Sequence, residues 1–297
     1  MAVALALVAA LLFALGSVLQ QKAGLAEPRT GSSSGLLLRM ARRPVWLAGI
    51  LADAFGFVGQ AAALSLGRLA VVQPLLVSSV VFALPLGARL TGQRVRPIDV
   101  GAALLVLGAL IAFLVVANPS DGRDDAPFGQ WLVAAAVIAA VVAPMVVVAR
   151  RLGPAPRAAV LGIATGILFA LSAALTKAVT DRLDDGVLEL FVDWRLYALL
   201  AVGYVSMTLN QLALSTGVLA PAVATSMAFD PIASVVLGTT LLQESLHETP
   251  LGTAATIASL AAALVGIAIL SRTQAGPPAA KPAAGSDAAA LLAPAAP

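Results

Sequence analysis

Nine apolar segments, each long enough to cross a lipid bilayer, constrain the fold of this chain more than any other feature. They cover residues 2–21, 45–66, 69–90, 98–117, 130–149, 158–178, 194–214, 218–242 and 251–271. A helix needs about 20 apolar residues to span the hydrocarbon core. Lipid offers backbone groups no hydrogen-bond partner, so only helices and closed barrels cross it, and these segments lack the alternation of barrel strands. The sequence predicts an all-α polytopic membrane protein of nine transmembrane helices.

The composition excludes several classes of function. Only 11% of the residues are charged, against about 25% in soluble domains. The chain has no cysteine, which excludes disulfides, thiolate metal sites and cysteine nucleophiles, and His247 is its one histidine. The basic residues are scattered between apolar segments, which argues against binding of nucleic acid. We find neither a nucleophile–base pair nor a phosphate-binding GxxxxGK string, so we expect no enzyme and no cofactor.

Two parts of the chain are not predicted to span the membrane, and the first apolar segment has to be distinguished from a signal peptide. Residues 22–44 contain GLLLRMARRP, which is short and basic and is typical of an interfacial turn of helix, although residues 32–45 could form a tenth helix. The first apolar segment has no preceding basic region, so we interpret it as an uncleaved helix. Residues 272–297 are rich in proline and alanine and are predicted to be a disordered tail.

Lysine and arginine predict the orientation. With nine spans, thirteen of the 18 basic residues fall on the side opposite the N-terminus. The five on the N-terminal side are Arg68, Arg123, Lys177, Arg182 and Arg195. The positive-inside rule places the N-terminus outside and the C-terminus in the cytoplasm, in a multi-pass protein of the cytoplasmic membrane.

The predicted outer side also carries a run of acidic residues. Its members are Asp181, Asp184, Asp185, Glu189 and Asp193. They form either a solvated loop or a weak vestibule that attracts cations.

The chain repeats itself at a distance of half its length. ALSLGRLA at residues 63–70 returns as ALSTGVLA at 213–220, FALGSVLQQKA at 13–23 returns as FALSAALTKA at 169–178, and Gln93 matches Gln243. Four helices therefore match four helices, and one linking helix between them reverses the second set. This predicts two inverted repeats, residues 1–117 and 158–271, joined by residues 118–157, an arrangement that serves alternating access.

These features resemble a known group of transporters. AALSLGRLAVVQPLLVSSVV at 62–81 and LNQLALSTG at 209–217 are similar to strings of the drug/metabolite transporter (DMT) superfamily, which includes EamA-like proteins. The resemblance is greatest to its NIPA-type magnesium transporters and covers roughly residues 1–272. It implies a permease fold and, as one alternative, transport of a divalent cation.

Two carboxylates inside predicted spans are the main site candidates, because an ionisable group in lipid usually faces a cavity. Asp230 lies near the middle of its helix, with Ser226 and Ser234 one turn to either side. Pro231 is expected to break this helix and free a carbonyl oxygen beside the acid. Asp53 is the second acid. Either carboxylate would ligate the metal in a cation carrier, or would simply bridge neighbouring helices through hydrogen bonds.

A less specific polar set accompanies the two acids. It comprises Gln60, Gln73, the second expected helix-breaker Pro74, Asn210 and Gln211. Lys22 and Lys177 end the paired first helices and are expected to reach the membrane interface. Gly162 and Gly166 in GIATG predict a close helix contact.

We therefore expect a secondary transporter that moves a small solute or cation by alternating access, with lipid as its surroundings. A NIPA-like magnesium carrier is one alternative, and a non-transporting membrane scaffold or lipid-interacting protein is another. A homodimer is an open alternative for its assembly.

Overall fold

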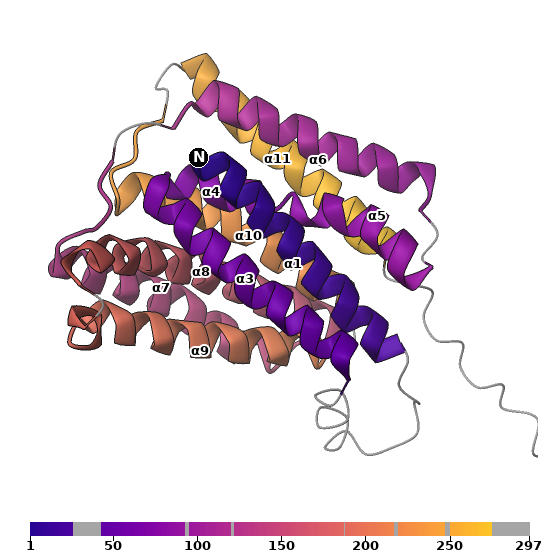
Figure 1. The fold of residues 1–297 in the computed structure, drawn as a ribbon, viewed down its shortest axis with the longest axis horizontal. Coiled ribbons are helices and arrows are strands. Elements are labelled where there is room, and N and C mark those ends of the chain that lie inside the picture. Colours follow the sequence, from indigo (N-terminus) through magenta and orange to yellow (C-terminus); the bar gives the residue numbers. More distant parts are fainter. Residues whose placement is uncertain are drawn as a thin grey trace, which may run out of the picture.

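The computed structural model describes residues 1–25, 43–92, 95–119, 122–186, 188–216, 219–246 and 250–274. Within these ranges the chain folds into helices, without a strand (Figure 1). Nine stretches are long and apolar enough to cross a membrane in the described residues, as the sequence predicts. The expectations for a helix at 32–45 and a tail from residue 272 fall largely outside the described ranges.

The helices begin and end close to the predicted bounds. They are α1 (Ala2–Leu25), α3 (Pro44–Leu66), α4 (Leu69–Leu76), α5 (Ser79–Thr91), α6 (Pro97–Ala117), α7 (Phe128–Ala149), α8 (Pro154–Asp181), α9 (Trp194–Leu214), α10 (Leu219–Thr240) and α11 (Pro250–Gln274). Two short 3₁₀ turns, η1 (Arg182–Asp185) and η2 (Glu189–Phe191), lie between α8 and α9. Proline is the first residue of α3, α6, α8 and α11, a position where its missing N–H costs nothing.

The third span is interrupted, whereas the eighth is not. After Pro74 the chain makes tight turns, in which Val77 N donates to Pro74 O at 3.2 Å and Ser78 N donates to Leu75 O at 3.0 Å, and α4 ends there. The expected break at Pro231 is wrong, because α10 continues through it to Thr240. A proline removes one backbone donor, and the helix continues when its neighbouring backbone bonds are kept.

Contacts between helix ends and loops assign the loops to two opposite faces of the helix bundle, which we call face A and face B. Face A holds the start of α1, the α3–α4 turn at residues 67–68 and the described parts of three connections, residues 118–119 and 122–127, 182–186 and 188–193, and 241–246. Ala2 lies beside Gly67 there, and Arg123 N donates to Leu242 O at 2.8 Å. Face B holds the opposite ends. This alternation requires an odd number of crossings between the N-terminus and the end of α11.

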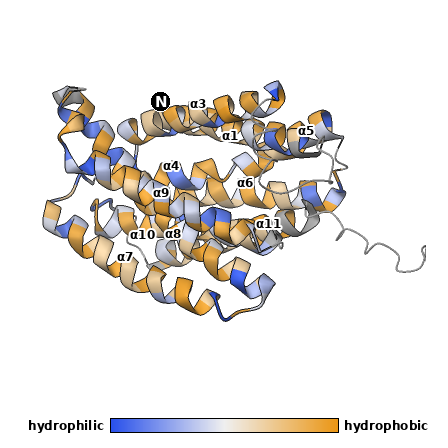
Figure 2. Cartoon of the chain, turned by 90° about the horizontal axis from the view of Figure 1, so that it is seen from below, coloured by the Kyte–Doolittle hydropathy of each residue, from blue (hydrophilic) through white to orange (hydrophobic). Residues whose placement is uncertain are grey.

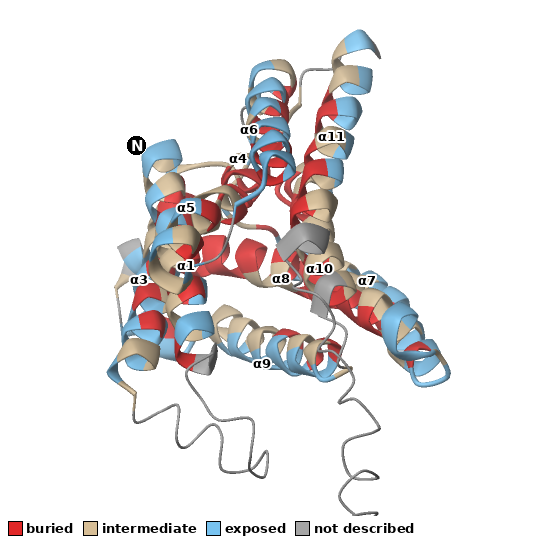
Figure 3. Cartoon of the chain, turned by 90° about the vertical axis from the view of Figure 1, so that its right-hand side faces the viewer, coloured by how far each residue is buried: buried red, intermediate tan, exposed pale blue. Residues whose placement is uncertain are grey.

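The helices pack in three groups. Figures 1 and 3 show α1 with α3 and α5, a buried α8 in contact with α7, α9 and α10, and α6 paired with α11. The α4 helix connects the groups, because it contacts α1, α8 and α10. Large apolar side chains such as Val133, Val137 and Val141 of α7 are exposed, and apolar residues cover most of the helical surface (Figure 2). Such a surface suits lipid rather than water.

Aromatic residues mark face A at the starts of α7 and α9. The ring centroids of Phe128 and Trp194 lie 5.0 Å apart, and those of Trp131 and Trp194 lie 6.2 Å apart, both edge to face. Tryptophan is enriched where membrane helices meet the headgroups. The cluster packs the starts of these two helices against each other on face A.

Candidate functional site

Asp230 lies near the middle of α10, about 15 Å by helical rise from the end at Thr240. Its side chain is half-buried. Ser234 Oγ donates a hydrogen bond to Asp230 Oδ1 at 3.3 Å. Among the described residues no lysine or arginine forms an ion pair with Asp230. The acid is thus inside a candidate membrane span, and the part of the chain that the structure describes gives it no cationic partner.

The backbone around Asp230 is held against α8 by two glycines. A Cβ atom on Gly166 would lie 2.6 Å from Ser226 O and 2.9 Å from Asp230 N. A Cβ atom on Gly162 would lie 2.4 Å from Ala222 O. The GIATG string is therefore the close helix contact that the sequence predicts, and it fixes the stretch of α10 that carries Asp230.

The two serines on this face of α10 are both buried. Ser234 is completely enclosed, and its hydroxyl is the one that bonds to Asp230. Ser226 Oγ donates to Val223 O of its own helix at 3.1 Å. Ser234 is thus directly joined to the acid, whereas Ser226 contributes its backbone to the α8 contact.

Asp53 belongs to a different contact, between α1 and α3. Gln20 Nε2 donates to Asp53 Oδ2 at 2.5 Å. A Cβ atom on Gly16 would lie 2.0 Å from Asp53 Oδ1, so the carboxylate rests directly on the α1 backbone. This acid bridges two helices, which is the structural alternative given for it from the sequence.

Gln73 is the most enclosed member of the predicted polar set. Its side chain is 2% exposed, and Nε2 has no hydrogen-bond partner among the described residues. It lies on α4, which contacts α8 and α10, and Pro74 beside it is buried. A buried amide without a partner is a group that water or a ligand can satisfy.

The other predicted amides are less enclosed. Gln60 and Asn210 are half-buried, and Gln211 is exposed. Their helices, α3 and α9, do not carry Asp230. The structure thus joins Asp230 to Ser234, and leaves the Ser226 hydroxyl and these three amides outside that hydrogen bond.

Lys177 does not reach for the membrane interface, which corrects the sequence-based expectation. It is 1% exposed, and its ammonium donates to Leu64 O at 3.1 Å and to Gly67 O at 2.8 Å. Asp124 Oδ1 lies 2.8 Å from the same nitrogen. Three acceptors match the three N–H groups of a lysine. Lys22, its sequence counterpart, is exposed.

Glu244 was missed by the sequence reasoning. It is 3% exposed, and its two carboxylate oxygens accept hydrogen bonds from Leu69 N at 2.6 Å and Ala70 N at 2.8 Å. These are the first two N–H groups of α4, whose own cap residue, Arg68, supplies no side-chain bond. The sequence offered one signal for this residue: Glu244 directly follows an apolar segment, on the face that also carries the first octapeptide copy, ALSLGRLA.

A second ionic group on face A joins the 118–127 connection to α9. Arg195 forms ion pairs with Asp125 and, at 2.9 Å, with Asp193. Trp131 Nε1 donates to Asp125 Oδ1 at 2.9 Å. Burial raises the pKa of Asp125, but the hydrogen bonds from Arg195, Trp131 and the Ala126 N–H and the charge of Arg195 together bring it below its ordinary value.

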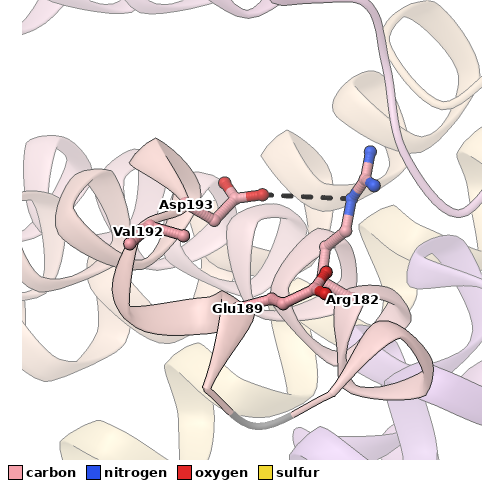
Figure 4. A pocket seen from close by; sticks show the side chains of 4 residues that line it. All are labelled: Arg182, Glu189, Val192 and Asp193. Carbon is pink, nitrogen blue, oxygen red and sulfur yellow. Dashed lines mark ion pairs between the residues drawn. The ribbon is translucent and has the colours of Figure 1, made fainter.

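Two of the five acids of the predicted vestibule, Glu189 and Asp193, line a surface pocket. It is lined by Arg182, Glu189, Val192 and Asp193 (Figure 4). Arg182 Nε lies 4.0 Å from Asp193 Oδ2, so the positively charged Arg182 side chain lies next to these acids. No residue of α10 lines this pocket, which separates it from Asp230.

Comparison with known proteins identifies one full-length relative. The chain is 31% identical to the uncharacterized protein Cgl0250/cg0304 of Corynebacterium glutamicum over 279 residues, which cover 93% of this chain and 96% of the relative. The chain belongs to this protein's family. No family model matches the chain. No solved structure matches it.

An alignment of that length passes through both halves of the chain. Within the described residues, no group of three or more His, Cys, Asp or Glu side chains is placed to hold a metal ion. The described geometry at Asp230 offers one carboxylate with the Ser234 hydroxyl beside it.

Proposed function

We propose that this chain is a secondary transporter of the cytoplasmic membrane that moves a small solute or cation by alternating access, with Asp230 as its coupling acid. The observation that carries the proposal is the position of Asp230: it lies midway along a spanning helix, half-buried and without a cationic partner in the described residues. An uncompensated charge at that depth is costly and usually marks an ion or substrate pathway.

The chemistry follows from what surrounds this acid. A carboxyl group that no lysine or arginine neutralises stays neutral by holding a proton, or is neutralised by a bound cation. Ser234 supports the ionised form by donating to it, and one hydrogen bond is modest compensation for burial. A site with these properties can take up a proton on one face of the membrane and a cationic group on the other.

The packing of the helices supports two related halves. The first helix of each proposed repeat, α1 or α8, is packed against the next two spans of its own half, and α6 and α11 pair with each other. Inverted repeats around a midplane site are the usual architecture for alternating access. We retain the DMT-like, EamA-like assignment as part of this proposal, with a divalent cation such as Mg²⁺ as one candidate substrate.

A reconstituted system tests the function. Liposomes containing the purified protein and a trapped pH-sensitive dye are exposed in turn to Mg²⁺, to monovalent cations and to organic cations. A transporter coupled through Asp230 moves protons when its substrate is added, and Asp230→Asn removes that signal. Ser226→Ala is the matched control, because the Ser226 hydroxyl bonds within its own helix and not to Asp230.

A scaffold predicts a different outcome. If the protein is a non-transporting partner of other membrane proteins, none of the three groups of cations produces a proton signal. Asp230→Asn would then differ from the wild type only in thermal stability.

A further inference from the structure

The α3–α4 turn on face A is bound at both of its helix ends by charges from distant parts of the chain. Lys177 of α8 donates to carbonyl oxygens at the end of α3, and Glu244, after α10, accepts from the first N–H groups of α4. A cation at a helix C-terminus and an anion at a helix N-terminus both match the helix dipole. We call Lys177, Glu244 and the turn at residues 67–68 the α3–α4 clamp.

Glycines make room for the acidic half of the clamp. A Cβ atom on Gly238 would lie 2.5 Å from Glu244 Oε2, and one on Gly122 would lie 2.8 Å from Glu244 Cγ. Gly122 has φ +95°, a conformation that side chains rarely adopt. Arg68 Nη1 also donates to Gly122 O, at 3.3 Å. Residues 122–124 therefore lie directly against the clamp.

The matched sequence elements on the opposite face are packed differently in the residues that the structure describes. ALSTGVLA joins α9 to α10 on face B, as ALSLGRLA joins α3 to α4 on face A, and Lys22 is the counterpart of Lys177. Yet Lys22 is exposed while Lys177 is buried. The contact of α3 with α8 has no counterpart of similar extent between α9 and α1 in the described residues.

We propose that the α3–α4 clamp is a releasable gate, which holds face A closed in this structure, and that Lys22 performs the corresponding closure at the end of α9 in the opposite state. This inference rests on the proposed transport function. Lys177 and Glu244 act as positioning residues, since they hold the turn closed and do not contact Asp230. Release breaks hydrogen bonds to the backbone, which water can replace once the turn moves outward.

Cysteine accessibility tests the gate, because the chain has no native cysteine. Gln73→Cys places a thiol on α4, one turn beyond the clamp. The substitution should be tolerated, because cysteine is smaller than glutamine and the Gln73 Nε2 group that it removes makes no hydrogen bond in the described residues. A Glu189→Cys variant, exposed on face A, identifies whether intact cells or inverted vesicles present that face to an impermeant maleimide. The Gln73→Cys protein should be protected from this reagent on face A.

Loss of the clamp should expose the thiol. Adding Lys177→Met is expected to raise the labelling rate of Gln73→Cys about tenfold, equivalent to about 1.4 kcal/mol in the balance between closed and open states. Glu244→Ala should do the same, so the test survives if Lys177→Met fails to accumulate. Lys22→Met, the same exchange in the other half, should leave the thiol protected.

The outcomes separate the gate from the transport function. Unchanged protection in both clamp variants overturns the gate, and so does equal exposure in the Lys22→Met control, because that result would be general loosening. If the gate opens as expected but Asp230→Asn transports like the wild type, the gate stands and the assignment of Asp230 fails.

Discussion

Replacing Gly166 by alanine probes the α8–α10 contact that holds Asp230. The new Cβ atom would lie 2.6 Å from Ser226 O, which is shorter than an ordinary contact of about 3.5 Å by about 0.9 Å. Both contacted atoms, Ser226 O and Asp230 N, belong to the backbone, so the helices must separate rather than a side chain turn aside. Overpacking of this kind costs about 1–3 kcal/mol.

Gly108→Ala is the matched control. Gly108 is an exposed glycine within α6, and a Cβ atom there meets nothing within 4 Å. Both variants gain up to about 1 kcal/mol of helix propensity, so their difference isolates the overpacking at Gly166. At about 2 °C per kcal/mol for a chain of this size, Gly166→Ala should unfold about 2–6 °C below Gly108→Ala.

The assay is thermal unfolding of the two purified variants in the same detergent, followed by intrinsic fluorescence at one heating rate. Gly166→Ala should also lower any transport activity, because it displaces the backbone of Asp230. An unfolding temperature equal to or above that of Gly108→Ala would refute the close α8–α10 packing on which the site depends.

Two further predictions concern the polar residues near the membrane faces. The pKa of Asp125 lies below its ordinary 3.8, so the carboxylate stabilises the fold above pH 3.8 and loses that effect as pH falls through its folded pKa. Asp125→Asn should therefore lower the unfolding temperature at neutral pH, and the difference from the wild type should shrink only below pH 3.8. A difference that stays constant with pH would contradict the Arg195 ion pair as its cause. For the orientation, Glu189→Cys should react with an impermeant reagent in intact cells and Arg151→Cys should not; the opposite result would place the N-terminus in the cytoplasm.

The spanning helices were predictable because composition and length decide them. An apolar segment in lipid has to form a helix, and its proline or charged flanks mark the ends, so most bounds agree within a few residues. The largest difference is α8, which extends to Pro154 and Asp181, beyond the predicted 158–178. Its last turns carry Lys177, whose ammonium is paired within the protein, so a charge that would normally end a span lies inside the helix.

The contacts between helices were not predictable in the same way. The bond from Leu69 N to Glu244 joins residues 175 positions apart, and no local pattern indicates it. The interruption at residues 77–78 follows Pro74, whereas Pro231 leaves α10 intact, because the surrounding packing decides what a proline does to a helix. The acid in the middle of α10 was identified because a charge within an apolar segment is conspicuous without knowledge of its neighbours.

The pH dependence of transport in the Asp230→Asn variant tests the central claim most directly. Uptake of the identified substrate into liposomes is measured across a range of pH for the wild type, Asp230→Asn and the Ser226→Ala control. The proposal predicts that wild type and control share one pH-dependent profile, and that Asp230→Asn, while folded and inserted, loses coupled transport and with it the dependence on pH. An Asn variant that transports at the wild-type rate with an unchanged profile would contradict the claim and leave Asp230 as a helix-packing residue.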